Sequence, residues 1–185
     1  NVYSKVSAGI FEPMYAGFGG EVLYKPFSEN YSLGMEIYKV KKRDYAQKFD
    51  LLDYEVITGH FIFNYYMPKL GMLANITYGK YLAEDIGYTF DLSRKNKNGF
   101  RAGIFFSNTD VSQLEFGEGS FDKGFYFQIP FDFFSKSYSG NYLNFKMRPL
   151  TRDGAAKVEV GNDLTGLIFN ASQTEIGNGW NGFFD

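Results

Sequence analysis

Apolar and polar residues alternate along most of the chain, and this period of two is typical of a β-strand with one apolar face. In residues 31–38, for example, Tyr, Leu, Met and Ile hold the odd-numbered positions, whereas Ser, Gly, Glu and Tyr hold the even-numbered ones. The alternation predicts strands at 6–10, 16–24, 31–38, 56–65, 72–79, 86–93, 100–107, 125–132 and 143–148. With a weaker strand expected near the C-terminus, the pattern predicts about ten strands in all.

Turn-forming residues separate these strands at a spacing typical of antiparallel hairpins. They occur at 12–13, 26–30, 68–71, 96–99 and 135–140, where Gly, Pro, Asn and Ser are concentrated. The chain has no repeated motif and no low-complexity segment. The sequence therefore predicts an all-β fold, a purely antiparallel meander.

A water-soluble β-sandwich and an outer-membrane β-barrel share this alternation, and three features favour the barrel. The polar face carries mainly Gly, Ser, Thr, Asn and Tyr, whereas a water-facing sheet normally carries more Lys and Glu. Strands of about ten residues, at roughly 3.3 Å each and about 45° of tilt, span about 23 Å, close to the roughly 25 Å apolar band of such barrels. Aromatic residues near the strand ends predict the girdles that flank this band. They are Phe11, Tyr24, Phe27, Tyr65, Tyr66, Tyr81, Phe100 and Phe134.

The lengths of the loops between the predicted strands also favour the barrel. The two longest are predicted at 40–52 and 109–122, after the third and the seventh strands, so both lie at the same end of the sheet. Long loops at one end and short turns at the other are the outer-membrane pattern. We therefore expect residues 1–159 to be a section of a transmembrane outer-membrane β-barrel, complete or part of a larger one. Residues 160–185 are expected to be a C-terminal strand or tail without an assigned role.

The composition narrows the classes of function. Lys and Arg number 19 against 21 Asp and Glu, for a formal net charge of −2, which argues against a nucleic-acid-binding protein. The absence of Cys excludes a disulfide scaffold, thiol catalysis and a zinc–thiolate site. No apolar run is long enough for a transmembrane helix. The first residues lack the basic and apolar regions of a signal peptide, so we expect a processed or partial chain.

Candidate catalytic and metal-binding residues are few. His60 is the only histidine, and on the polar face of its strand it could serve as a general base. A single inward-facing histidine is more often a structural hydrogen-bonding group. The acidic residues between 110 and 122 lack the ligand pattern of a calcium loop. We therefore predict no enzyme activity, no catalytic residue, no metal and no cofactor.

A basic cluster of Lys39, Lys41, Lys42 and Arg43 stands at the start of the first long predicted loop. Such a cluster is either a solvated surface or a contact for lipopolysaccharide phosphates or an anionic polymer. The sequence leaves both interpretations open.

Several longer motifs, taken together, resemble those of one protein family. In chain order they are Arg43-Asp44-Tyr45, Asp53-Tyr54-Glu55, Thr58-Gly59-His60, Tyr78 to Gly87, Thr109 to Ser112, Phe116 to Gly124 and Arg148 to Gly154. They resemble the C-terminal part of the YjbH/GfcD family of exopolysaccharide-biosynthesis outer-membrane proteins, over roughly residues 12–158. The resemblance implies an exported β-barrel, often a lipoprotein, in the outer membrane of a Gram-negative cell. The resemblance implies no catalytic residue in this sequence.

The resemblance and the strand pattern together predict a component of an exopolysaccharide or capsule secretion system that helps the polymer to cross or to be anchored. Its expected partners are outer-membrane lipids and lipopolysaccharide, the exopolysaccharide and other secretion proteins, with no nucleic acid. The position of each residue within its strand selects candidate lumen residues for polysaccharide contact: Glu36, His60, Asn64, Asn75, Thr77, Asp91, Arg101, Gln128, Asn144, Lys146 and Arg148. For each of them, cross-strand hydrogen bonding that fills the barrel is the competing interpretation.

Three other functions stay open at this point. The first is an outer-membrane hydrolase that acts on lipid or polymer and is centred on His60. The second is a filled structural barrel that docks periplasmic secretion partners through its short turns. The third is a soluble carbohydrate-binding sandwich.

Overall fold

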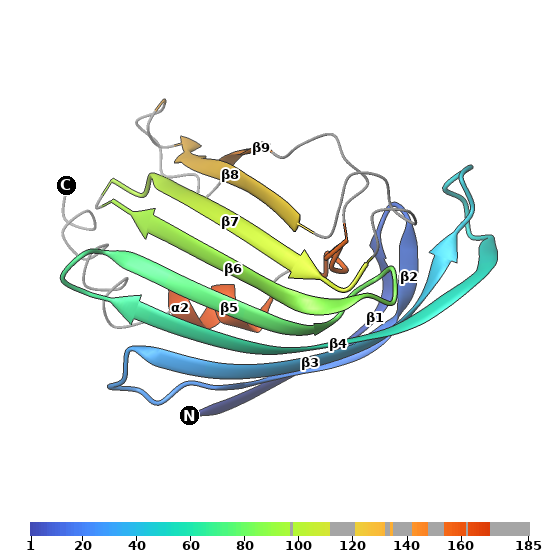
Figure 1. Ribbon diagram of the computed structural model, residues 1–185, viewed down its shortest axis with the longest axis horizontal. Coiled ribbons are helices and arrows are strands. Elements are labelled where there is room, and N and C mark those ends of the chain that lie inside the picture. Colours follow the sequence, from blue (N-terminus) through green and yellow to red (C-terminus); the bar gives the residue numbers. More distant parts are fainter. Residues whose placement is uncertain are drawn as a thin grey trace.

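The computed structural model describes residues 1–96, 98–111, 121–131, 134, 142–147, 154–161 and 163–170. Within them, nine antiparallel strands form one sheet in which each strand pairs with its neighbours in the chain (Figure 1). The strands are β1 (Val2–Glu12), β2 (Tyr15–Tyr24), β3 (Tyr31–Arg43), β4 (Leu51–Met67), β5 (Met72–Lys80), β6 (Ile86–Lys95), β7 (Arg101–Thr109), β8 (Phe121–Pro130) and β9 (Tyr142–Met147). The predicted antiparallel meander is confirmed.

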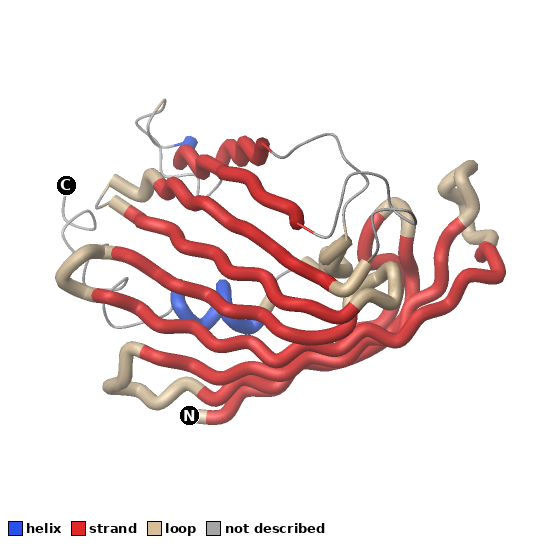
Figure 2. The backbone as a smooth tube through the Cα atoms, viewed as in Figure 1, coloured by secondary structure: helices blue, strands red, loops and turns tan. Residues whose placement is uncertain are grey.

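The sheet is strongly curved, so that it has a concave and a convex face (Figures 1 and 2). The right-handed twist of neighbouring strands accumulates across a long sheet, which favours curvature of this kind. β1 and β9 are the two edges, and among the described residues they do not pair with each other. The described strands therefore form an open sheet.

The β3–β4 hairpin extends beyond the neighbouring strands (Figure 1). β4 pairs with β5 only from Gly59 to Met67, so its residues 51–58 reach past the end of β5. The loop predicted at 40–52 was wrong in its bounds, because residues 44–50 alone connect the two strands. Three consecutive basic residues interrupt the apolar alternation at 41–43, yet the pairing of β3 with β4 reaches Arg43, with a register shift between Lys41 and Arg43.

The two faces of the sheet differ in polarity. On the concave face side chains are mostly polar and buried, whereas on the convex face they are mostly apolar and exposed. Ile37 and Phe61 on the convex face are 59% and 65% exposed, and Glu36 and His60 on the concave face are 6% and 2% exposed. Other exposed apolar residues of the convex face are Val6, Ile10, Phe18, Val22, Leu33, Met35, Ile57, Phe63, Ile76, Tyr78, Ile86, Tyr88, Ile104, Phe125 and Phe127. The predicted apolar and polar faces are therefore both present.

Residues 154–161 and 163–170, called the inner segment below, lie against the concave face and end in the helix α2 (Leu164–Asn170). α2 contacts β1 and β2, and it lies within the curve of the sheet (Figure 2). The weaker strand expected near the C-terminus is absent from the described part of that region, where this helix forms instead. Leu164 and Ile168 stand four residues apart, which is a helical spacing. Residues 171–185 lie outside the described residues.

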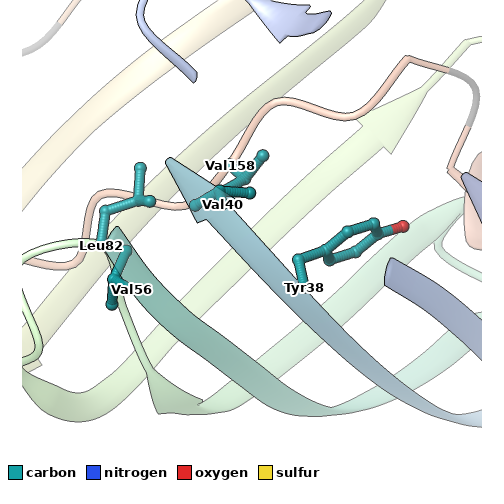
Figure 3. Packing of buried hydrophobic residues seen from close by; sticks show 5 residues of the cluster. All are labelled: Tyr38, Val40, Val56, Leu82 and Val158. Atoms are coloured by element: carbon teal, nitrogen blue, oxygen red, sulfur yellow. The ribbon is translucent and has the colours of Figure 1, made fainter. Parts of the chain in front are cut away.

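The inner segment meets the sheet at a small apolar cluster (Figure 3). Val158 of the inner segment packs there with Tyr38, Val40, Val56 and Leu82. Removing these side chains from water favours the contact by about 25 cal/mol per Å² of apolar surface. Among the described residues, no helix combines the length and the apolar character required to cross a membrane.

Candidate functional site

Hydrogen bonds between side chains cross the concave face from strand to strand. Asn64 Nδ2 on β4 donates to Ser32 Oγ on β3 at 3.1 Å. Asn75 Nδ2 on β5 donates to Asn64 Oδ1 at 2.7 Å, and Thr77 donates to Asn75 Oδ1 at 3.1 Å. Ser32 and Asn64 are fully buried, and buried polar groups need such partners. This row therefore ties β3, β4 and β5 together through their polar side chains.

A second row begins at Tyr81, in the turn after β5. Its hydroxyl lies 2.8 Å from Thr89 Oγ1, which in turn lies 2.8 Å from Ser107 Oγ. Burial raises the pKa of the Tyr81 phenol above its ordinary value, so the group stays protonated and can donate. Tyr81 is 1% exposed, so its predicted place in the outer aromatic girdle was wrong. The turn carries its ring inwards over the concave face, where the ring packs on His60.

Phe11 was also predicted in the girdle and is likewise turned towards the interior. Its ring lies edge-on to Tyr38, with the ring centroids 5.5 Å apart. It is partly buried against the apolar cluster that contains Tyr38. The position of an aromatic residue near a strand end does not determine the face on which its ring lies. The register of that strand with the adjacent strand determines it.

Glu36 and His60 form a buried pair on the adjacent strands β3 and β4. His60 Nδ1 donates to Glu36 Oε1 at 2.8 Å. The side chain of Glu36 is 6% exposed and that of His60 is 1% exposed. Lys157 of the inner segment places its Nζ 2.8 Å from the same carboxylate oxygen. A buried carboxylate needs such partners, because removing its charge from water is costly. The pair on the sheet is therefore completed by a cation from outside the sheet.

The environment of His60 restricts its chemistry. Its ring packs on Tyr81 with the centroids 4.6 Å apart. His60 Nε2 is buried and has no hydrogen-bond partner within the described part of the chain. A substrate cannot reach this nitrogen while Tyr81 and the inner segment keep these positions. No group of three or more potential metal ligands occurs among the described residues.

Backbone and side-chain hydrogen bonds hold the inner segment at the turn after β5. Ala155 N donates to Asp85 Oδ2 at 2.6 Å. Leu82 N donates to the carbonyl oxygen of Ala156 at 2.9 Å. These bonds fix the beginning of the inner segment beside Lys157 and Val158, which contact the sheet next.

Glu21 on β2 holds the other end of the inner segment. Its Oε2 accepts a hydrogen bond from Leu164 N, the first residue of α2, at 2.8 Å. Its Oε1 lies 2.7 Å from Lys5 Nζ and accepts from the Tyr38 hydroxyl at 2.6 Å. The gap between Leu164 and the sheet measures about 10 Å³, which is room for about one water molecule. The inner segment thus fills the concave face along β1–β4.

The contacts described above join the inner segment mainly to β1–β4, and the concave face continues across β6–β9. Two rows of paired residues cross this part of the sheet. The first row is Lys95, Arg101, Gln128 and Asn144, and the second is Ser93, Gly103, Tyr126 and Lys146. Tyr126 donates to Asp91 Oδ1 at 3.0 Å. This part of the face therefore gathers amides, a phenol and charged groups.

Two aromatic rings lie directly over glycines of the neighbouring strand in this region. A Cβ atom at Gly103 would lie 2.3 Å from Tyr126 Cζ, and one at Gly124 would lie 2.7 Å from the Phe105 ring. Lys146 Nζ lies 5.0 Å from the centroid of the Phe105 ring. The glycines let both rings lie flat on the sheet. Alternation does not reveal this arrangement, since it depends on which residues are paired across strands.

Comparison with known proteins places the chain in a family. The model of the YjbH family, described as exopolysaccharide biosynthesis protein YbjH, matches residues 1–169. The chain belongs to this YjbH family. A curated relative, the uncharacterized lipoprotein YjbH of Escherichia coli (strain K12), is 36% identical over an alignment of 161 residues, and the alignment covers 84% of this chain. The family suggested by the motifs between residues 12 and 158 is therefore confirmed, and with it a relation to exopolysaccharide biosynthesis.

The chain spans less than a quarter of the length of this curated relative. The aligned region is 23% of the length of the Escherichia coli lipoprotein. No solved structure matches the chain.

The predicted lumen residues of this YjbH-family chain fall into two groups. Those with side-chain hydrogen bonds on the concave face are Glu36, His60, Asn64, Asn75, Thr77 and Asp91. Those in the two rows that cross β6–β9 are Arg101, Gln128, Asn144 and Lys146. Arg148 lies outside the described residues. Sequence reasoning missed Glu21, Lys157 and Tyr126. Tyr126 and Glu21 share the concave parity of their strands, whereas Lys157 carries no strand pattern.

The basic cluster at 39–43 divides between structural and exposed side chains. Arg43 is buried and donates to the carbonyl oxygens of Pro13, Gln47 and Lys48 at 3.0, 2.6 and 2.7 Å. Lys39 pairs with Glu55 at 2.7 Å on the convex side. Arg43 therefore holds the tip of the β3–β4 hairpin.

Proposed function

We propose that this chain is a section of an outer-membrane β-barrel that helps an exopolysaccharide to cross, or to be anchored in, the outer membrane of a Gram-negative cell. Membership of an exopolysaccharide biosynthesis family supports the link to the polymer. The polarity of the two faces supports a location in the membrane. No enzyme activity enters the proposal.

The exposed apolar face is the observation that carries the proposal. The strands from β1 to β8 all contribute exposed apolar residues to the convex face, while polar side chains are buried on the concave face. This is the reverse of a sheet that packs its apolar side on a core and turns its polar side to water. It is the distribution of a membrane barrel, whose outer surface faces lipid and whose interior is polar.

The strand lengths agree with a membrane span. β2, β6 and β8 each have 10 residues, and transmembrane β-strands need about 9–11 residues at about 45° of tilt. In a bilayer the backbone groups of an open sheet edge would be unsatisfied. The proposal therefore requires β1 and β9 to be paired in the assembled barrel.

The filled half of the interior favours a second candidate function. The inner segment occupies the concave face along β1–β4, as expected for a structural barrel that docks other secretion proteins through its turns. Hydroxyl and amide groups on the concave face of β6–β9 favour weak contact with a sliding polymer. The two candidates differ in whether polymer enters the barrel.

Fractionation of cells that express the intact protein tests the membrane proposal. We expect recovery in the outer-membrane fraction and a shift on a gel between unboiled and boiled samples, since folded barrels resist detergent until heated. A deletion strain should then export less polymer. Recovery without detergent in the supernatant, with no gel shift, would contradict the proposal and favour a carbohydrate-binding sandwich.

A further inference from the structure

Three buried carboxylates hold the inner segment on the concave face, and they are called the latch carboxylates below: Glu21, Glu36 and Asp85. Each binds one group of the inner segment at 2.6–2.8 Å, and these groups are two backbone N–H groups and the Lys157 ammonium. The latch carboxylates come from β2, from β3 and from the turn after β5. They therefore fasten the inner segment at both ends and between them.

Apolar packing and backbone pairing of the inner segment with the sheet are limited. Among the described residues, Val158 and Leu164 are the large apolar side chains of the inner segment that are buried. Residues 154–161 form no strand. The bond from Leu82 N to Ala156 O is the one backbone–backbone hydrogen bond that joins the described inner segment to the rest of the chain. A strand added to a sheet would form a ladder of such bonds, so the inner segment can leave without disrupting the sheet.

Buried polar atoms beside the inner segment lack partners while it is attached. His60 Nε2, Asp85 Oδ1 and Thr109 Oγ1 are buried and have no hydrogen-bond partner within the described part of the chain. Asp85 and Glu36, the partner of His60, are latch carboxylates, and a Cβ atom at Gly154 would lie 2.5 Å from Thr109 Oγ1. Buried polar atoms without partners cost free energy. Displacement of the inner segment would recover it, because water would then reach these atoms.

The start of the inner segment also holds a strained residue. Ala155 has a φ of 62°, in the left-handed region that a residue with a Cβ atom rarely adopts. Its N–H donates to the latch carboxylate Asp85. Such conformations persist only where surrounding contacts hold them, and they are concentrated at switch regions. Release of this hydrogen bond would let Ala155 return to an ordinary conformation.

We propose that the inner segment is a displaceable plug, which closes the concave face along β1–β4 and must leave the latch carboxylates before a polymer enters. The proposal rests on the proposed function and adds the regulation of the interior of the barrel. On displacement, water takes the place of the three groups bound to the latch carboxylates. An inner segment that never moves would instead belong to the filled structural barrel.

The test measures the ion conductance of the intact protein in planar lipid bilayers, with the inner segment either free or bridged to the sheet. This chain contains no Cys, so Val40→Cys and Val158→Cys together introduce one pair of thiols, within the apolar cluster. Oxidation, or a short bis-methanethiosulfonate reagent, joins the two thiols. We expect the bridged protein to lose its conductance and dithiothreitol to restore it.

Leu33→Cys with Phe63→Cys is the control for bridging, because these residues of β3 and β4 are directly paired on the convex face. Bridging them should leave the conductance unchanged. Lys157→Gln weakens the attachment at Glu36 without a bridge, and it should raise the ratio of open to closed time about tenfold. Lys39→Gln removes a convex-face cation of similar exposure, 43% against 38% for Lys157, and should leave that ratio unchanged.

The outcomes separate the plug from the proposed function. Loss of the heat-dependent gel shift in the unaltered protein would overturn the barrel itself. In a folded barrel, conductance that persists after the Val40→Cys, Val158→Cys pair is bridged would overturn the plug alone. So would a folded barrel that conducts neither unaltered nor with Lys157→Gln, and this result would favour the filled structural barrel. An unaltered protein that stays closed until Lys157→Gln opens it would support the plug, as reversible closure by the bridge would.

Discussion

Tyr126 lies flat over Gly103 on the neighbouring strand, so close that a Cβ atom at Gly103 would stand 2.3 Å from the ring carbon Cζ. The two residues are directly paired between β7 and β8. The absence of a side chain at one position therefore determines where the phenol at the other lies, and the phenol in turn reaches Asp91 on β6.

Gly103→Ala is expected to destabilise the protein by about 1–3 kcal/mol, because the ring or the strand must move to admit the methyl group. The temperature at which the folded form is lost on a heat-modifiability gel should fall. Gly59→Ala is the matched control, since the nearest atom to its added Cβ, Glu36 O, lies 3.5 Å away.

The Gly103–Tyr126 contact also predicts coupling between two substitutions. In a protein that already carries Tyr126→Ala, Gly103→Ala should destabilise the fold much less, because the ring that the new methyl group would displace is absent. Equal losses with and without the ring would contradict this explanation of the Gly103 effect.

Glu36→Ala should lower the free energy of unfolding by about 3–5 kcal/mol, because it leaves the buried His60 and the partly buried Lys157 without their shared carboxylate. Lys39→Ala removes one partner of a surface ion pair whose side chains are 43% and 45% exposed. It should lower the free energy of unfolding by about 0–1 kcal/mol. Urea unfolding of both variants in the same lipid or detergent provides the comparison. Similar losses in the two variants would contradict the buried role of Glu36.

Replacement of His60 separates catalysis from structure. His60→Gln keeps a donor that can bind Glu36, and we expect polymer export at the level of the unaltered protein, after correction for the amount of folded protein. His60→Ala should lower the amount of folded protein instead. Loss of export by a fully folded His60→Gln protein would favour the hydrolase.

Arg43→Gln should loosen the tip of the β3–β4 hairpin, because three carbonyl oxygens lose their shared donor. Tyr45 and Phe49 in the tip are 71% and 91% exposed, so chymotrypsin should cleave there faster while the rest of the barrel stays intact. Lys39→Gln, which removes a cation of the same strand that pairs with Glu55, should be cleaved at the original rate. Cleavage on intact cells would in addition place this tip outside the cell, where the long loops of outer-membrane barrels lie. An unchanged rate in Arg43→Gln would contradict the bracing role of Arg43.

Much of the fold could be predicted because strand alternation is a local property. Successive side chains point to opposite faces, so Ile37 and Glu36 were assigned to different faces from their neighbours alone. The same rule placed Asn64, Asn75 and Thr77 on the polar face. The girdle assignment of Tyr81 and Phe11 was wrong because it rested on their position near strand ends, where turns and register decide the direction of a side chain.

The sequence by itself determined the antiparallel meander, the two faces and the family, since each of these depends on local pattern or on contiguous motifs. Only the tertiary structure decided that Lys157 meets Glu36, that Glu21 anchors Leu164 and that Tyr126 rests on Gly103. These residues are distant in the chain or belong to different strands, and no periodic pattern links them. Their contacts follow from the curvature of the sheet and the exact pairing of its strands, which all the strands determine together.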